Sequence, residues 1–118
     1  MRILIADDEP NIVTALEFLL SRSGYEVEVA RDGIQALALA AFSDLVLLDV
    51  MMPLRDGFEV CREIRRRADG ARIRIVMLSA KGSQADIDRG LQAGADLYVT
   101  KPFSNRELLD KIEGLLAR

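Results

Sequence analysis

Residues 45–49 read Leu-Val-Leu-Leu-Asp, a short run that is apolar at four successive positions and ends on a carboxylate. An apolar run of this length without alternation is typical of a central strand in a parallel sheet covered by helices on both faces. Residues 3–6 have the same character, whereas residues 27–30, Val-Glu-Val-Ala, alternate and indicate an edge strand. Two further runs, at residues 73–78 and 97–99, complete a set of five expected strands.

Stretches with helical periodicity separate these runs, and their starts are readable. We expect helices to begin where proline or a capping residue opens each stretch, near Pro10 and at Asp32, Asp56, Ser83 and Ser104. Arg65–Arg67 is interpreted as a solvated helix end that suits the helix dipole. Five strand–helix units with short connections predict a three-layer α/β domain with a doubly wound parallel sheet. We expect residues 1–118 to form this single domain, with no output domain in the chain.

Composition excludes several kinds of chemistry. The chain has 118 residues, no histidine and one cysteine, so histidine-dependent triads, histidine-ligated zinc and internal disulfides are excluded. The cysteine, Cys61, lies on an apolar helix face and is interpreted as a core residue. Sixteen basic and 19 acidic residues give a net charge of −3, which argues against direct binding of nucleic acid. The longest uncharged stretch, residues 33–43, is too short to span a membrane, and we expect a soluble cytoplasmic protein.

Polar side chains follow four of the five expected strands: Asp7 and Asp8 the first, Asp49 the third, Ser79 the fourth and Lys101 the fifth. Because the carboxyl ends of parallel strands meet at one edge of the sheet, we expect these side chains to converge. Two carboxylates about 4 Å apart repel by roughly 4 kcal/mol at an effective dielectric constant near 20, so the cluster needs cations. Oxygen ligands favour Mg²⁺, with Mn²⁺ or Ca²⁺ as alternatives, and Lys101 adds one more positive charge.

A carboxylate beside such a metal ion can act as a nucleophile and form an aspartyl phosphate. Asp49 is the best candidate because it ends the central strand. Lys101 would neutralise charge on the transferring phosphoryl group, and Ser79 would hydrogen-bond one of its oxygens. A phosphatase with an aspartyl nucleophile is a competing interpretation, although Met51 occupies the position where that class usually has a second acid. A flavodoxin-like cofactor site is disfavoured because the acidic first loop would repel phosphate.

Four stretches of the chain resemble the receiver domain of two-component response regulators. They are Asp7-Asp8-Glu9-Pro10, residues 48–59 (Leu-Asp-Val-Met-Met-Pro-Leu-Arg-Asp-Gly-Phe-Glu), Leu78-Ser79-Ala80 and residues 94–103 (Gly-Ala-Asp-Leu-Tyr-Val-Thr-Lys-Pro-Phe). Together they extend over essentially the whole chain, and their order on one strand–helix frame is highly specific. The resemblance implies a flavodoxin-like sheet with the strand order 2-1-3-4-5.

The resemblance also implies a role for each residue of the cluster. Asp49 would be the residue that accepts the phosphoryl group. Asp8 would bind Mg²⁺ directly, together with Asp49 and the main-chain carbonyl of Met51, while Asp7 would act through water. The domain would then be a signalling switch rather than an enzyme, because its only reactions would be Mg²⁺-dependent self-phosphorylation and autodephosphorylation.

A paired movement of two side chains reports phosphorylation in this family. Ser79 would turn toward the phosphoryl group, and Tyr98 would rotate inward. Lys101 would contact the phosphoryl group, next to a cis peptide bond to Pro102. The changed surface would be that of helix 4, strand 5 and helix 5.

The resemblance identifies partners as well. Receivers take their phosphoryl group from a phosphohistidine on a histidine kinase or a histidine phosphotransfer protein, and helix 1 and the neighbouring loops bind that partner. Ile12, Leu16 and Pro102 are the candidate contacts here. An output domain or downstream target would bind the helix 4–strand 5–helix 5 surface, with no direct contact to nucleic acid or membrane.

Two questions about assembly stay open. Receivers joined to winged-helix domains often carry Asp-Asp-Tyr at the start of strand 5, where the second Asp pairs across a dimer face. Here Leu97 stands in that position, so a homodimer on phosphorylation is neither required nor excluded. A degenerate receiver that serves only as an interaction module is the remaining alternative.

Overall fold

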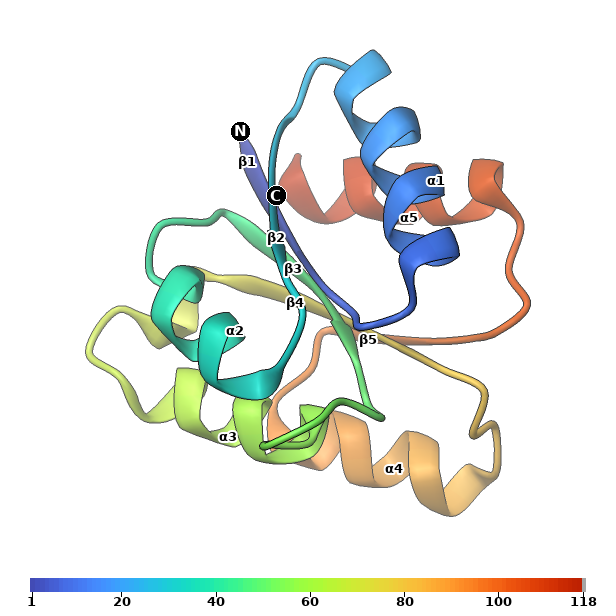
Figure 1. Ribbon diagram of the computed structural model, residues 1–118. Helices are drawn as coiled ribbons and strands as arrows, with labels where there is room; N and C mark the ends of the chain where they lie inside the picture. The colour runs from blue at the N-terminus through green and yellow to red at the C-terminus, as the bar shows by residue number, and fades with distance from the viewer. Residues whose placement is uncertain (118) are drawn as a thin grey trace.

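The computed structural model describes residues 1–117 and contains five strands that alternate with five α-helices (Figure 1). In chain order the elements are β1 (Arg2–Ala6), α1 (Pro10–Arg22), β2 (Glu26–Ala30), α2 (Gly33–Ala40), β3 (Leu45–Asp49), α3 (Gly57–Arg66), the 3-10 helix η1 (Gly70–Arg72), β4 (Arg74–Ser79), α4 (Gln84–Ala93), β5 (Leu97–Thr100) and α5 (Asn105–Leu116). Every expected strand and helix is present. No sequence pattern predicted η1.

The five strands form one parallel sheet in the order β2-β1-β3-β4-β5, which confirms the predicted topology. β3 is buried at every position, as its unbroken apolar run indicated. β2 lies at an edge and exposes Glu26 and Glu28, which confirms the interpretation of its alternating pattern. The register pairs Asp49 with Leu78 and Ser79 with Thr100, so the strands end side by side.

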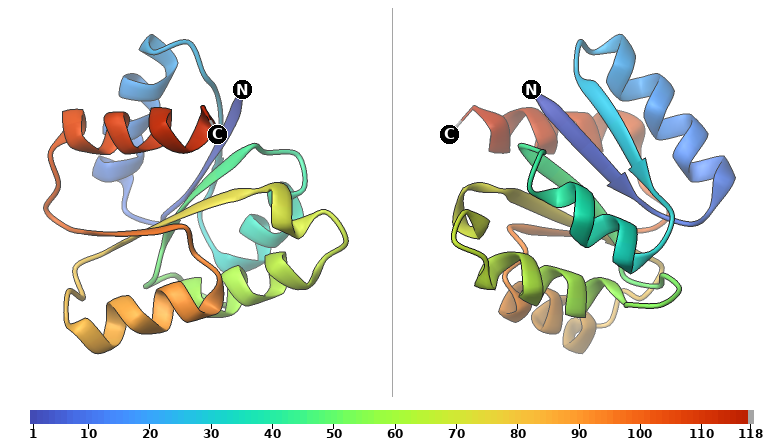
Figure 2. Two further views of the ribbon diagram at one scale, coloured as in Figure 1. Left: turned by 180° about the vertical axis from the view of Figure 1, so that it is seen from behind. Right: turned by 60° about the vertical axis from the view of Figure 1, so that its left-hand side comes forward.

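Helices cover the sheet on both faces, which confirms the three-layer prediction (Figures 1 and 2). α1 and α5 pack on one face, where Ile3 and Ile5 of β1 point. α2, α3 and α4 pack on the other face, where Leu4 and Ala6 point. Cys61 is buried in this second layer, as predicted. Within residues 1–117, the structure has no helix with the length and hydrophobicity needed to cross a bilayer.

The helices begin where the sequence predicted, because side-chain oxygens accept hydrogen bonds from the free amide groups of the first turn. Four such caps are present. The side-chain oxygens of Asp32, Asp56, Ser83 and Ser104 accept hydrogen bonds from the amides of Gln35, Glu59, Asp86 and Glu107, respectively. α1 begins at Pro10 without a side-chain cap. α4 is capped at its C-terminus by Gly94, whose φ of 115° lies in the left-handed region that glycine tolerates.

The prediction that Arg65–Arg67 forms a solvated helix end holds for Arg66 and Arg67, which are exposed, and is wrong for Arg65. Arg65 donates to three main-chain carbonyls that lie outside α3. Arg67 donates to the carbonyl of Leu37 in α2 at 2.6 Å. Arg66 pairs with Glu63 of its own helix.

Two more arginines, Arg72 in η1 and Arg74 in β4, also donate to main-chain carbonyls of other elements. Arg72 donates to the carbonyls of Ala41 and Ser43 behind α2, and Arg74 donates to the carbonyl of Leu115 in α5. The physical reason is the direction of the helices. Each helix runs antiparallel to the strands, so free carbonyls at the helix C-termini gather at the amino end of the sheet, within reach of these arginines.

Candidate functional site

Three carboxylates meet at the carboxyl end of the sheet. Asp7 follows β1 directly, Asp8 comes next, and Asp49 is the last residue of β3. Each offers an oxygen, and the three oxygens lie within 4.8 Å of one another. Asp7 and Asp49 are only 1% and 5% exposed, whereas Asp8 is open to solvent. The structure therefore brings together the three acids that the sequence placed at one edge.

Lys101, the residue that follows β5, faces the two buried acids. Its Nζ lies 3.2 Å from Oδ2 of Asp7 and 3.6 Å from Oδ1 of Asp49. Burial on its own would lower the pKa of Lys101, but the carboxylates of Asp49 and Asp7 outweigh burial and raise the pKa. The peptide bond from Lys101 to Pro102 is cis, as the resemblance implied.

Main-chain amides orient the two buried carboxylates. The N–H of Glu9 donates to Oδ1 of Asp7 at 2.9 Å, and the N–H of Met51 donates to Oδ1 of Asp49 at 3.3 Å. In both loops an aspartate bonds the amide two residues later, which is a common turn for this residue type. Both side chains are thereby held facing the lysine.

The cluster carries more negative charge than its lysine balances. Burial, together with the negative charges of Asp7 and Asp8, raises the pKa of Asp49 to about 6. Lys101 and the Met51 amide act in the opposite direction without cancelling the increase. Three oxygen donors with unbalanced negative charge are the donor set that suits a hard divalent cation such as Mg²⁺.

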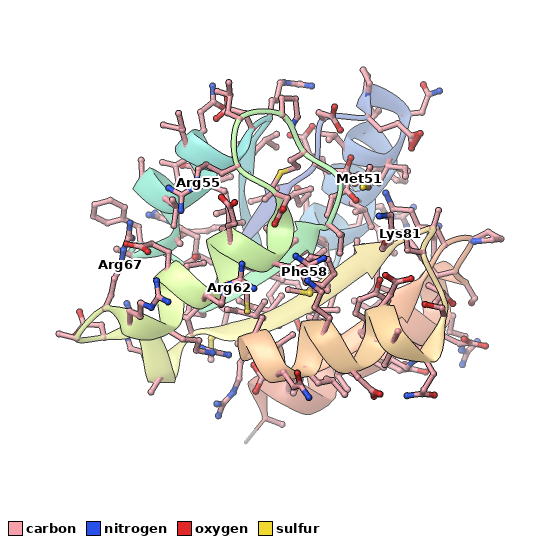
Figure 3. All side chains as sticks on the ribbon, turned by 90° about the horizontal axis from the view of Figure 1, so that it is seen from below. Met51, Arg55, Phe58, Arg62, Arg67 and Lys81 are labelled. Atoms are coloured by element: carbon pink, nitrogen blue, oxygen red, sulfur yellow. The ribbon has the colours of Figure 1, made fainter. Side chains whose placement is uncertain are left out.

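Ser79 lies beside the cluster at the end of β4. It is fully buried, and its hydroxyl accepts the N–H of Lys81 at 3.0 Å. Its carbonyl accepts the N–H of Lys101 at 2.8 Å, which ties the ends of β4 and β5 together. In Figure 3, Met51 and Lys81 lie toward this edge of the molecule, with Arg67 at the opposite end of α3.

Tyr98 does not belong to the acidic cluster. Its hydroxyl donates to the carbonyl of Lys81 at 2.6 Å. Lys81 thus bonds Ser79 through its amide and Tyr98 through its carbonyl. The loop between β4 and α4 therefore connects the edge of the acidic cluster to β5.

A groove of about 550 Å³ runs beside Lys101, between the first half of α1 and the loop that leads into α5. Ile12 and Pro102 line it, as expected for a docking surface. Leu16, the third expected contact, also lines it, although its side chain is only 1% exposed and packs mainly between α1 and the sheet. Phe103 is a lining residue that the sequence reasoning missed, although it follows the Lys-Pro pair directly.

The family model of the response regulator receiver domain matches residues 3–113. Solved structures agree over nearly the full length of the chain. The receiver domain of sensor histidine kinase PA1611 from Pseudomonas aeruginosa PAO1, described with a magnesium ion coordinated in the active-site cleft, is 36% identical with a TM-score of 0.91, covering 99% of this chain and 98% of that one.

Two further solved structures are similar over nearly the whole chain. A CheY-like response regulator receiver domain protein from Methanospirillum hungatei JF-1 is 35% identical with a TM-score of 0.88, covering 97% of this chain and 92% of its own. Chemotaxis protein CheY4 of Vibrio cholerae is 33% identical with a TM-score of 0.89, and 97% of each chain is covered. The match over residues 3–113, on a fold with the strand order 2-1-3-4-5, shows that this chain belongs to the response regulator receiver domain family.

Proposed function

We propose that this domain is a phosphorylation-controlled switch in which Asp49 accepts a phosphoryl group from a phosphohistidine partner. The observation that carries the proposal is the convergence of Asp7, Asp8 and Asp49 within 4.8 Å, opposite the amine of Lys101. A degenerate receiver would have no need for two buried, repelling carboxylates. Their retention supports an active acceptor.

The donor set supports Mg²⁺ as the resident ion. Asp8 and Asp49 would hold it through side-chain oxygens, Asp7 through water and Met51 through its main-chain carbonyl. When bound, the ion supplies positive charge next to the oxygens of the transferring phosphoryl group. Mn²⁺, which also prefers oxygen ligands, is the alternative ion. The Pseudomonas relative with magnesium in its cleft supports this assignment.

The transfer itself requires one bond to form and one to break. An Asp49 oxygen attacks phosphorus, and the bond from phosphorus to the imidazole nitrogen of the partner breaks. The imidazole keeps the electron pair and takes up a proton. Lys101, whose raised pKa keeps it charged, balances the developing negative charge on the phosphoryl oxygens. The Ser79 hydroxyl supplies a hydrogen bond to one of those oxygens.

The groove beside Lys101 is the proposed docking site for the histidine kinase or phosphotransfer protein. Ile12, Pro102 and Phe103 give it an apolar lining next to the acceptor carboxylate. Leu16, which is almost fully buried, forms part of the floor of the same groove. A partner helix that lies in the groove would bring its phosphohistidine to Asp49.

The α4–β5–α5 surface is the proposed output face, read by an output domain or a downstream target. When Ser79 turns toward the phosphoryl group, its hydroxyl stops accepting the amide of Lys81. The carbonyl of the same residue holds Tyr98, so the change reaches β5 through one loop residue. Dimerisation on phosphorylation would use this face as well, with Leu97 in place of a charged contact.

The proposal is tested with Mg²⁺ and acetyl phosphate, followed by mass spectrometry of the intact chain. We expect one phosphoryl adduct per chain, which requires Mg²⁺ and disappears in Asp49→Asn. Asp110→Asn, which changes an exposed acid on α5, is the matched control and should be phosphorylated normally. An adduct that persists in Asp49→Asn, or no adduct on the wild-type chain, would refute the proposal.

A further inference from the structure

The two halves of α4 are anchored very differently. Its only buried residues are Gly90 and Ala93, and both lie in the C-terminal half. Gly90 sits so close to the sheet that a Cβ atom there would lie 2.7 Å from the Tyr98 ring and 2.9 Å from the sulfur of Met77. No residue from Gln84 to Arg89 is buried. The burial that holds a helix on its sheet is therefore concentrated at the end of α4.

Arg65 adds a polar clamp at that same end. Its Nε donates to the carbonyl of Gly94, the C-cap of α4, at 2.9 Å. Its Nη2 pairs with Asp96 at 3.0 Å, and the same carboxylate oxygen accepts the N–H of Ile75 in β4 at 2.8 Å. The Arg65 side chain is 20% exposed and that of Asp96 28%, so solvent weakens these bonds only in part. One guanidinium group therefore ties α3, α4, β4 and β5 together.

The N-terminal end of α4 has weaker attachments to the rest of the domain. The hydroxyl of Tyr98 donates to the carbonyl of Lys81 in the loop that precedes α4. Arg89, near the middle of the helix, stacks on the ring of Phe58 in α3 with its guanidinium carbon 4.2 Å from the ring centre. Arg89 is exposed while the Phe58 ring beneath it is buried, so this contact holds the middle of the helix rather than its N-terminal end.

We propose that Arg65 holds the C-terminal end of α4 as a fixed pivot, about which the N-terminal half and the β4–α4 loop move. The motion belongs to the fold and is present before phosphorylation. It goes beyond the proposed function, because it does not depend on Asp49 as acceptor. Its consequence is that the moving surface is the first half of α4, and a partner that reads the state of the domain must contact that half.

Amide hydrogen exchange on the unphosphorylated protein tests the pivot, because it measures local opening at individual positions. The amide of Ile87, bonded to Ser83, reports the N-terminal end, and the amide of Ala95, bonded to Gly90, reports the C-terminal end. In the wild-type chain we expect the Ile87 amide to exchange faster. In Arg65→Lys we expect exchange at Ala95 to rise by roughly tenfold or more, because hydrogen bonds from a charged donor are lost. Exchange at Leu47 in β3 serves as the measure of global unfolding.

Two variants complete the experiment. Tyr98→Phe removes the loop bond and should speed exchange at Ile87 while leaving Ala95 unchanged. Arg66→Lys is the matched control. Arg66 is the exposed neighbour of Arg65, so this substitution should change exchange at neither end of α4. Equal protection at both ends of the wild-type helix would overturn the proposal. It would also be overturned if Arg65→Lys raised exchange at Ile87, Ala95 and Leu47 by the same factor, since that would show a general loss of stability rather than a pivot.

Discussion

Replacing Asp49 with asparagine removes one negative charge from the cluster and leaves an oxygen that can still accept the Met51 amide. In the folded wild-type chain, burial and the neighbouring acids raise the pKa of Asp49 from 3.8 to about 6. At about 1.36 kcal/mol for each tenfold change in proton affinity, this increase corresponds to about 3 kcal/mol. At neutral pH and without metal, the ionised Asp49 therefore destabilises the fold by about that amount.

The direction of the pH dependence follows from linkage. The folded state binds the Asp49 proton more tightly than the unfolded state does, so its contribution to stability is complete below about pH 4. That contribution is lost as the pH rises through about 6. The raised pKa of Lys101 adds stability that is lost only at strongly alkaline pH, because a free lysine titrates near 10.5. Between pH 4 and 7 the acid therefore dominates.

The measurement is urea unfolding, followed by far-UV circular dichroism, at pH 4 and at pH 7.5 with a chelator present. We expect Asp49→Asn to raise the free energy of unfolding by about 3 kcal/mol at pH 7.5 and to have little effect at pH 4. Asp110→Asn, on the exposed face of α5, is the control and should change neither value. A gain that is equal at both pH values, or no gain at pH 7.5, would refute the electrostatic reasoning.

Three further predictions concern metal binding and backbone geometry. Mg²⁺ at about 100 times its Kd should raise the free energy of unfolding by about 2.7 kcal/mol, and by much less in Asp8→Asn. If Mg²⁺ stabilised the wild-type chain and Asp8→Asn equally in thermal or urea unfolding, the ion would bind elsewhere. Gly114→Ala, where a Cβ meets nothing within 4 Å, should stabilise α5 by about 0.5–1 kcal/mol, whereas Gly90→Ala should destabilise because its Cβ would lie 2.7 Å from Tyr98. Leu54 is 71% exposed with a φ of 72°, so Leu54→Gly should raise the free energy of unfolding by about 1 kcal/mol. Leu54→Ala keeps the Cβ atom and should not raise it. The same urea assay measures the glycine pair and the Leu54 pair.

The fold could be predicted in detail because its signals are local. The apolar run at residues 45–48 and the alternating run at residues 27–30 distinguish a central strand from an edge strand by burial alone. Capping residues such as Asp32 and Ser83 place helix starts because they satisfy amide groups within the same turn. The acidic cluster follows from the same information, since the ends of parallel strands must share an edge.

The errors concern contacts that only the packed structure creates. Leu16 belongs to the same helical stripe as Ile12 and lines the same groove, but periodicity does not show that Leu16 is almost fully buried. Arg65 looks like an ordinary solvated residue in the sequence, and the bond that the exposed Arg67 makes to α2 is equally hidden, because the partner carbonyls belong to other elements. The Arg65 bond to Gly94 crosses 29 positions of the chain, and the Arg67 bond to Leu37 crosses 30. No local pattern encodes such partners.

Strand and helix direction explain why the charges are arranged as they are. In a strand–helix repeat, helix N-termini and strand carboxyl ends share one edge of the sheet, and helix C-termini share the other. The first edge attracts anions, and there the domain places Asp7 and Asp49 close together at a cost in stability. The second edge offers free carbonyls, which Arg65 and its neighbours satisfy. Because the two sets lie at opposite ends, the arginine contacts can offset the strain of the acidic cluster without neutralising it, and the carboxylates stay free to bind a cation and a phosphoryl group.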